Sequence, residues 1–223
     1  MDEPARKGRH RILSDEVILR AAAKAFAAEG YEAMSVRQLN VDLGLSHETI
    51  RQRFGSKRHL YFAAVDLAVE HFYTLLTEER LALGAPEDEL DDLRRWVRAF
   101  IAASVRFPEL SNLVNHEAGT PGERIDYLYR VGFEPGMAFF AEVLDRLVRD
   151  EVIYPITIRD AFFLIDAVMS PFSQPGLSLA FDSLAGPLDE TTHVDSLIEL
   201  LFRGLVRPPA PSGSDSSSPP AAG

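Results

Sequence analysis

The sequence predicts an all-α protein with three short N-terminal helices followed by a larger helical domain. Apolar residues recur every three or four positions along most of the chain, the spacing that places them on one face of a helix. Serine or acidic residues stand where these segments start and glycine stands where several of them end, as is usual at helix termini. No convincing set of alternating strands is present. With 223 residues and 46% apolar side chains, the chain is long enough to bury a sizeable core.

Composition excludes several classes of protein. The chain has no cysteine, which rules out disulfides, thiolate metal sites and a cysteine nucleophile. It has no run of about eighteen apolar residues, so no transmembrane helix is expected. The N-terminal stretch MDEPARKGRHRIL is charged and lacks the apolar segment of a secretory signal, so a cytoplasmic location is expected.

Charge is distributed unevenly along the chain, whose net charge is −11. Residues 1–63 contain 11 Lys and Arg against 8 Asp and Glu, a net charge of +3. The remaining residues contain 12 against 26, a net charge of −14. Residues 1–13 are expected to form a basic N-terminal arm. Only the N-terminal part could therefore contact a polyanion, and the acidic remainder must stay away from it.

The first helices have recognisable start and stop residues. Ser14 can cap a first helix, which ends at Gly30, a residue that accepts left-handed backbone. A short second helix, capped by Ser35, is expected over 36–43, a third over 47–54, and a long fourth over 57–83.

The rest of the chain is also predicted to be helical, with three interruptions. Pro135 and Gly136 either kink one long helix over 123–150 or divide it into two. Residues 170–190 contain several prolines and glycines and are interpreted as an irregular connection. The tail 207–223 is rich in Pro and Ser and is expected to be disordered. Further helices are expected near 89–107, 110–114, 158–169 and 192–206.

Residues 36–54 have the layout of a helix-turn-helix. Gly44 breaks the two helices, Ser46 can cap the second, and Leu39 and Ile50 are spaced to close a small core between them. In such a motif the second helix lies in the DNA major groove, and flanking residues hold phosphates. The candidate DNA-binding residues are Ser35, Val36, Arg37, Ser46, His47, Glu48, Thr49, Arg51, Gln52, Arg53 and Lys57.

Basic residues on an exposed helix are more often a solvated face than a binding site. Here the turn glycine and the apolar spacing favour binding. Glu48 would place an acid near phosphates, although it could instead accept a hydrogen bond from a cytosine amino group.

Residues 14–62 resemble the DNA-binding domain of TetR-type transcriptional repressors. The matching features are Gly30-Tyr31, Ser35-Val36, Gly44-Leu45-Ser46, Phe54, and Lys57 followed by Leu60. The sequence departs from the family at Asn40, where a small residue is usual, and at Arg51, where Tyr is usual. Asn40 is therefore expected to loosen or tilt the pair of helices.

The resemblance implies a function for each part of the chain. Residues 14–60 would be the helix-turn-helix DNA-binding domain, and residues 61–206 would bind an effector and dimerise. Family members are homodimers that bind palindromic operators and leave DNA when a small effector binds. Helices 157–170 and 192–206 would pair across the two-fold axis, and the final helix, apolar on more than one stripe, supports this independently.

The effector pocket would lie within the larger domain. Aromatic residues at helical spacing are more often core than ligand lining, so this set is a hypothesis, and an apolar or aromatic effector is a guess from its composition. The candidates are Trp96, Phe100, His116, Glu117, Tyr127, Phe133, Phe139 and Phe162. No metal and no cofactor are expected.

Two alternatives have different sequence support. A helical adaptor could keep the helix-turn-helix fold without binding DNA, which Asn40 and Glu48 would permit. A serine hydrolase could use Ser178 with His193 and Asp195, but the sequence around Ser178 lacks the strand-turn-helix context of a nucleophile elbow. The chain is therefore not expected to be an enzyme.

Overall fold

The structure is a computed structural model that describes residues 13–208. These residues form helices and turns, with one isolated antiparallel bridge between Ile153 and Val206 and no strand among them. The predicted all-α class is confirmed. The predicted basic arm (1–13) and the tail (207–223) lie, except for Leu13, Arg207 and Pro208, outside the described residues.

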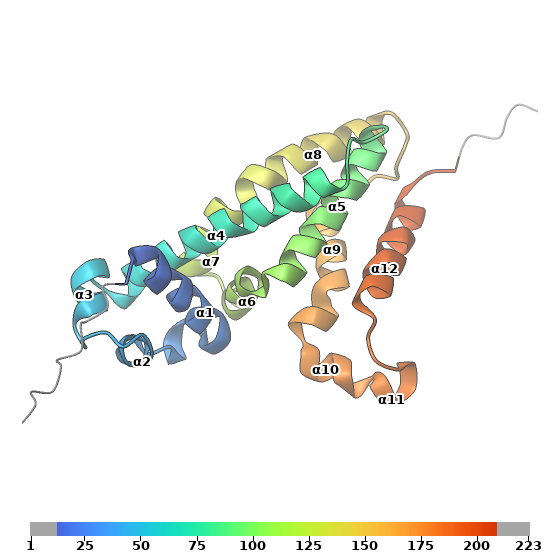
Figure 1. Cartoon of the computed structure of the whole chain (residues 1–223). Helices are drawn as coiled ribbons and strands as arrows, with labels where there is room; N and C mark the ends of the chain where they lie inside the picture. Colours follow the sequence, from blue (N-terminus) through green and yellow to red (C-terminus); the bar gives the residue numbers. More distant parts are fainter. Residues whose placement is uncertain (1–12, 209–223) are drawn as a thin grey trace, which may run out of the picture.

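Within residues 13–208, twelve α-helices follow one another, with a short π-helical segment between α7 and α8 (Figure 1). Their bounds are α1 Asp15–Ala33, α2 Val36–Asp42, α3 Thr49–Phe54, α4 Lys57–Ala82, α5 Glu89–Arg106, α6 Pro108–Glu117, α7 Glu123–Leu128, the π segment Tyr129–Phe133, α8 Glu134–Arg149, α9 Ile158–Ser173, α10 Pro175–Ala180, α11 Asp182–Ala185 and α12 Glu190–Leu205.

The N-terminal helices form a compact end of an elongated molecule, here called the head (residues 13–60); the remaining described residues are the body (Figure 1). Serine side chains cap α1, α2 and α4: Ser14 accepts from the Val17 amide, Ser35 from the Gln38 amide and Ser56 from the His59 amide. The caps by Ser14 and Ser35 were predicted, whereas that by Ser56 was not. These bonds fix where each short helix begins.

Asn40 is fully buried between α2 and α3 and holds them together. Its Nδ2 donates to the Val36 and His47 carbonyls, each at 3.1 Å, and its Oδ1 accepts from the Ile50 amide at 3.3 Å. A buried polar side chain with all these partners stabilises the turn. The expectation that Asn40 loosens the helix pair is therefore wrong.

The third helix begins later than predicted. It starts at Thr49, not at residue 47, and Glu48 precedes it without a side-chain capping bond. The Ser46 hydroxyl lies 2.7 Å from the Thr49 hydroxyl, so it does not cap a backbone amide as expected. Gly30 interrupts α1 with φ +77° as predicted, but three further residues continue helically behind it.

The long helix α4 starts in the head and extends along most of the body (Figure 1). A first apolar core joins α1 to α4 and continues to α5 and α6; it includes Phe26, Leu60, Tyr61, Ala103 and Leu113. A second core joins α5, α8, α9 and α12 and includes Val97, Leu144, Val168, Ile198 and Phe202. Because α4 is part of the first core along both halves, displacement of the body end of α4 can be transmitted to the head.

The structure decides two questions about proline-rich segments. Pro135 lies in the first turn of α8, directly after the π segment, and helical residues continue without a break from Glu123 to Arg149. The helical stretch therefore changes from π to α geometry just before Pro135. Residues 170–190 were predicted to be an irregular connection, and this prediction is wrong. They contain the end of α9 together with α10 and α11, which project from the body as a short helical arm (Figure 1).

Candidate nucleic-acid interface and internal cavity

The solvent face of α3 presents most of the side chains that the sequence singled out. His47, Glu48, Arg51 and Gln52 are exposed, and Thr49 is half-buried. Ile50, on the opposite face, is buried against the head core. The apolar spacing therefore turns hydroxyl, amide and guanidinium groups outward on one short helix, the chemistry that reads base edges in a major groove.

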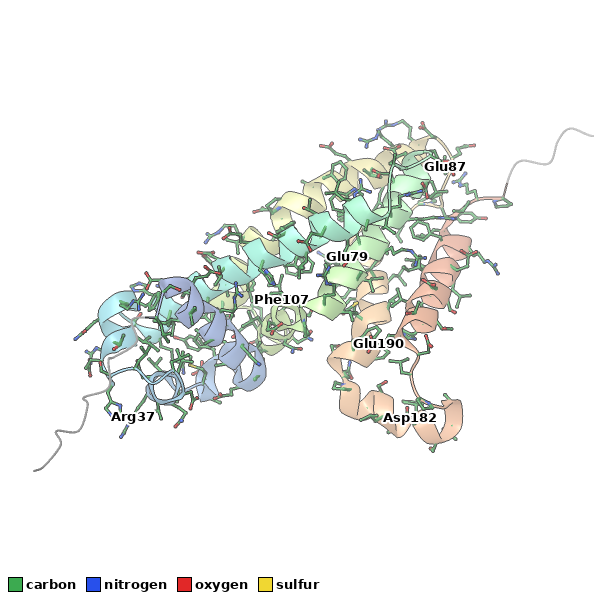
Figure 2. The ribbon with its side chains drawn as sticks, viewed as in Figure 1. Arg37, Glu79, Glu87, Phe107, Asp182 and Glu190 are labelled. Carbon is green, nitrogen blue, oxygen red and sulfur yellow. The ribbon has the colours of Figure 1, made fainter. Side chains whose placement is uncertain are left out.

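Two cationic residues flank α3 from neighbouring helices. Arg37 is exposed on α2, close to the capped N-terminus at Ser35, and points away from the body (Figure 2). Lys57, at the start of α4, is half-buried. Its Nζ donates to the Glu32 carbonyl at 3.2 Å and lies 4.8 Å from the centre of the Tyr31 ring. Val36 is half-buried against the first core.

Two other basic residues of the same stretch have carboxylate partners. Arg53 forms an ion pair with Asp15 and donates to the Leu13 carbonyl at 2.6 Å, which ties α3 to the start of α1. Arg58 Nε donates to Glu123 Oε2 at 3.0 Å, which ties α4 to α7. This guanidinium holds the pKa of the Glu123 carboxyl below its usual value. Arg53 and Arg58 therefore connect helices within the molecule.

The body contains a cavity of about 720 Å³, a volume typical of small-molecule sites. Its wall is formed by residues of α4, α5, α6, α8, α9 and the arm α10–α11. The predicted residues that line it are Trp96, Phe100, Phe133, Phe139 and Phe162. Several of these rings pack edge to face, including Phe133 against Phe162 with centroids 5.6 Å apart.

The π segment shapes one wall of the cavity. Gly132 and Phe133 belong to it and line the space, and the Gly132 carbonyl accepts from the Tyr73 hydroxyl at 2.9 Å. A Cβ atom at Gly136 would lie 3.5 Å from the same hydroxyl oxygen. Such π-helical turns are frequent at functional sites because they displace backbone and side chains from regular helical positions.

His116 and Glu117 lie elsewhere, at the junction of head and body, and Tyr127 packs against α4 within the body. His116 Nε2 is 3.1 Å from the Ala27 carbonyl of α1. Glu117 accepts from Arg124 Nε at 2.8 Å. Tyr127 donates to Asp66 at 2.6 Å, and desolvation together with this bond raises the pKa of Tyr127 to about 12. The structure therefore does not bring these three predicted residues into the cavity.

Arg124 joins both sides of this junction. Its guanidinium lies 4.2 Å from the centre of the Tyr31 ring and 3.4 Å from a Glu32 carboxylate oxygen, both in the head. The Tyr61 hydroxyl is buried nearby without a hydrogen-bond partner among the described residues, and burial raises the pKa of this phenol. The junction therefore combines these polar contacts with the apolar contacts of the first core.

Sequence reasoning missed many lining residues, among them Phe72, Tyr73, Phe140, Asp166 and Phe172. Phe72 of α4 belongs both to the first core and to the cavity lining. Asp166 had a usable signal, since an acid interrupts the apolar stripe of α9 one helical turn after Phe162.

The residues of the hydrolase alternative do not meet as a catalytic triad would. Ser178 lies in α10. His193 Nε2 is 3.2 Å from the Val168 carbonyl, and Asp195 forms an ion pair with Arg98.

In the described part of the chain, no helix is long and apolar enough to cross a membrane. Within that part, no cluster of three or more His, Asp or Glu side chains could hold a metal ion.

Comparison with known proteins gives one family for the head. Residues 18–64 match the family of bacterial regulatory proteins named tetR. The uncharacterized HTH-type transcriptional regulator YezE of Bacillus subtilis is 27% identical over 86 residues, and the match spans 39% of this chain and only 44% of YezE. The HTH-type transcriptional activator FasR of Mycolicibacterium smegmatis is 25% identical over 199 residues, spanning 86% of this chain and 83% of FasR.

Solved structures share the fold over most of the chain. AibR, solved in complex with isovaleryl coenzyme A and operator DNA, has a TM-score of 0.65 at 17% identity and covers 83% of this chain and 96% of its own. The hemolysin II transcriptional regulator HlyIIR has a TM-score of 0.61 at 20% identity and covers 86% and 97%. The family and these relatives are transcriptional regulators, not enzymes. Residues 18–64 therefore match the tetR family of bacterial regulatory proteins, and most of the chain shares the all-helical fold of these solved regulators.

Proposed function

We propose that the protein is a ligand-responsive repressor that binds a palindromic operator as a homodimer and is released by a small-molecule effector. The observation that carries this proposal is the pairing of an outward polar α3 face with a large cavity lined by α4, which starts in the head, and by α6, which contacts α1 of the head. Residues 14–60 would bind DNA and residues 61–206 would bind the effector and dimerise. This division is one of function, because the first core crosses it.

The arrangement around α3 supports binding to duplex DNA. Arg51 and Gln52 are exposed and can reach base edges, while Arg37 and Lys57 can hold phosphates on either side. Lys57 would exchange its bond to the Glu32 carbonyl for a phosphate, and its proximity to Tyr31 orients it at the start of α4. Binding to chromosomal DNA would place the protein in the cytoplasm.

Exposed apolar side chains on α9 and α12 support a homodimer. Phe163 is 62% exposed, Leu164 45% and Leu200 62%, although all three belong to amphipathic helices whose other faces are buried. A second copy would cover them and form a four-helix contact across a two-fold axis. Two α3 helices would then be separated by about one turn of DNA, roughly 34 Å, or somewhat more.

The proposed switch runs through α4 and α6. Phe72 and Tyr73 of α4 and Leu110 and Val114 of α6 line the cavity. The same helices carry Lys57 at the DNA face and His116 at the contact with α1. An effector that displaces these helices would change the spacing of the two heads, and the two affinities would be coupled by about 1–3 kcal/mol.

Activation is the second candidate mode of regulation, because the relative FasR is a transcriptional activator. A reporter gene placed behind the bound site separates the two modes, since deletion of the protein raises expression under repression and lowers it under activation.

Selection of bound sites from random duplex DNA by the full-length chain tests the proposed function. The account predicts a two-fold symmetric site with two half-sites. An enriched site without symmetry would contradict dimeric operator binding, and the absence of any enrichment would favour the adaptor alternative.

A further inference from the structure

We propose that the cavity takes a hydrophobic cation, an aromatic or alkyl ammonium or phosphonium compound, with its positive charge beside Asp166, and rejects carboxylates and other anions. This inference rests on the proposed effector role of the cavity and names the chemical class of the effector.

The charges that line the cavity all have one sign. Asp166 of α9, Asp182 of α11 and Glu190 of α12 belong to its wall. Among the described residues that line it, none is Lys, Arg or His. Figure 2 shows Asp182 on the projecting arm and Glu190 at the start of α12; Asp182 is half-buried and Glu190 is exposed. An anion entering this space would meet three carboxylates and no counter-charge.

Asp166 is exposed on α9 and lines the cavity beside aromatic residues. It follows Phe162 by one helical turn, so both side chains share a face of α9, and Phe162 packs edge to face on Phe133. Asp166 forms no hydrogen bond or ion pair with any other described residue. Partial burial raises the pKa of the carboxyl, so its charged form is less well solvated than that of a carboxyl on an open surface. A bound cation would compensate that charge.

The rest of the wall suits the apolar part of such a cation. The aromatic residues Phe72, Trp96, Phe100, Phe140 and Phe172 line the space. Aromatic faces attract a cation that has left water, and they also bury apolar substituents around its charge. A volume of about 720 Å³ accommodates a drug-sized molecule.

Tetraphenylphosphonium and tetraphenylborate are suitable probes, because they have nearly the same size and shape and opposite charges. Isothermal calorimetry on the full-length protein should give an affinity for the phosphonium at least about tenfold higher than for the borate. Equal affinities, a preference for the borate, or no binding of either ion would overturn the inference. This comparison needs no variant.

Asp166→Asn tests the assigned residue. It should lower the affinity for the phosphonium about tenfold and leave the affinity for the borate unchanged or higher. Glu142→Gln is the matched control, since Glu142 is exposed on α8 outside the wall and its removal alters the net charge equally. Equal effects of the two variants would show that total charge, and not Asp166, sets the preference.

The charge preference and the effector role fail separately. If the phosphonium binds as described but leaves the affinity for the selected operator unchanged, the cavity is a cation site and the proposed switch is wrong. If the phosphonium fails to bind while a neutral aromatic compound binds and releases the operator, the switch stands and the charge inference is wrong.

Discussion

Asn40 illustrates how one side chain can hold a short motif in place. Its amide bonds to the Val36 and His47 carbonyls and accepts from the Ile50 amide, so it bridges α2, the turn and α3. A small residue there would leave these backbone groups to find other partners in a buried space. The residue that departs from the family pattern therefore supplies its own compensating contacts.

Asn40→Ala should accordingly destabilise the head. We expect the free energy of unfolding to fall by about 1–3 kcal/mol, the usual cost of leaving buried polar groups without partners. Urea denaturation measures this change. Gln38→Ala on the same helix, which loses only an exposed bond to Asp42, is the control and should change stability far less. Equal effects would mean that the buried bonds of Asn40 contribute nothing specific.

Lys57 and Gln52 should differ in their effects on DNA binding. Lys57→Ala removes a proposed phosphate contact and should weaken binding to all duplexes by a similar factor. Gln52→Ala removes a proposed base contact and should cost about 1–3 kcal/mol on the selected operator with little effect on random duplex. Fluorescence anisotropy measures both affinities, with the remote exposed variant Arg203→Ala as the control. A sequence-dependent loss from Lys57→Ala would refute the phosphate assignment.

At the scale of the elements, the sequence predicted the helices whose limits are set by local chemistry. Ser14 and Ser35 cap the helices expected, and α4 runs over almost the predicted range. These limits depend on a serine hydroxyl and the adjacent amides, which are visible in the sequence. The head motif was predictable for the same reason.

Other elements depend on distant contacts and could not be predicted. The π segment before Pro135 is stabilised by the bond between its Gly132 carbonyl and Tyr73, which is far away in the sequence. The arm α10–α11 lies within a segment rich in proline and glycine, and this composition did not indicate its two short helices. His116, a polar residue just before a turn, was a candidate for the cavity lining, yet it contacts α1.

The contact between α6 and α1 should be sensitive to a single methyl group at Gly30. A Cβ atom there would lie 3.1 Å from His116 Nδ1, and the backbone has φ +77°. Gly30→Ala should therefore destabilise the fold by more than the about 1 kcal/mol expected for left-handed backbone alone. It should also change the affinity for operator DNA.

Gly186→Ala is the matched control for this backbone effect, because Gly186 has φ +78° and a Cβ atom there would meet nothing within 4 Å. Thermal unfolding and operator titration of both variants distinguish the cost of a positive φ from the effect of the contact between residue 30 and His116. If both variants lose the same stability and neither alters operator affinity, the contact between His116 and Gly30 does not couple the body to the head.

At the scale of the whole molecule, charge and shape act together. Residues 1–63 have a net charge of +3 and the remaining residues −14. The head, residues 13–60, lies at one end of an elongated structure (Figure 1). This arrangement places the acidic body away from a duplex that contacts α3. Two heads on one dimer would further increase the number of phosphate contacts.

The proposed dimer should depend on the apolar faces of α9 and α12. Phe163→Glu and Leu200→Glu should each raise the dimer dissociation constant at least about tenfold, because a charge would be buried in the interface. Light scattering coupled to size exclusion measures the mass. Leu81→Glu is the control, since Leu81 is 76% exposed at the far end of α4. A wild-type monomer, or dimers of unchanged affinity in both variants, would contradict this interface.

The measurement that tests the central claim most directly is a salt titration of binding to duplex DNA that contains the selected site. The account predicts tight binding at low ionic strength and a linear fall of log affinity with log salt, with a slope of about −0.9 per phosphate contacted. Lys57→Ala should make that slope shallower by about 1 for each subunit bound. Failure of the wild-type protein to bind any duplex at low salt, or an affinity independent of salt, would contradict the claim that α3 and its flanking cations hold DNA.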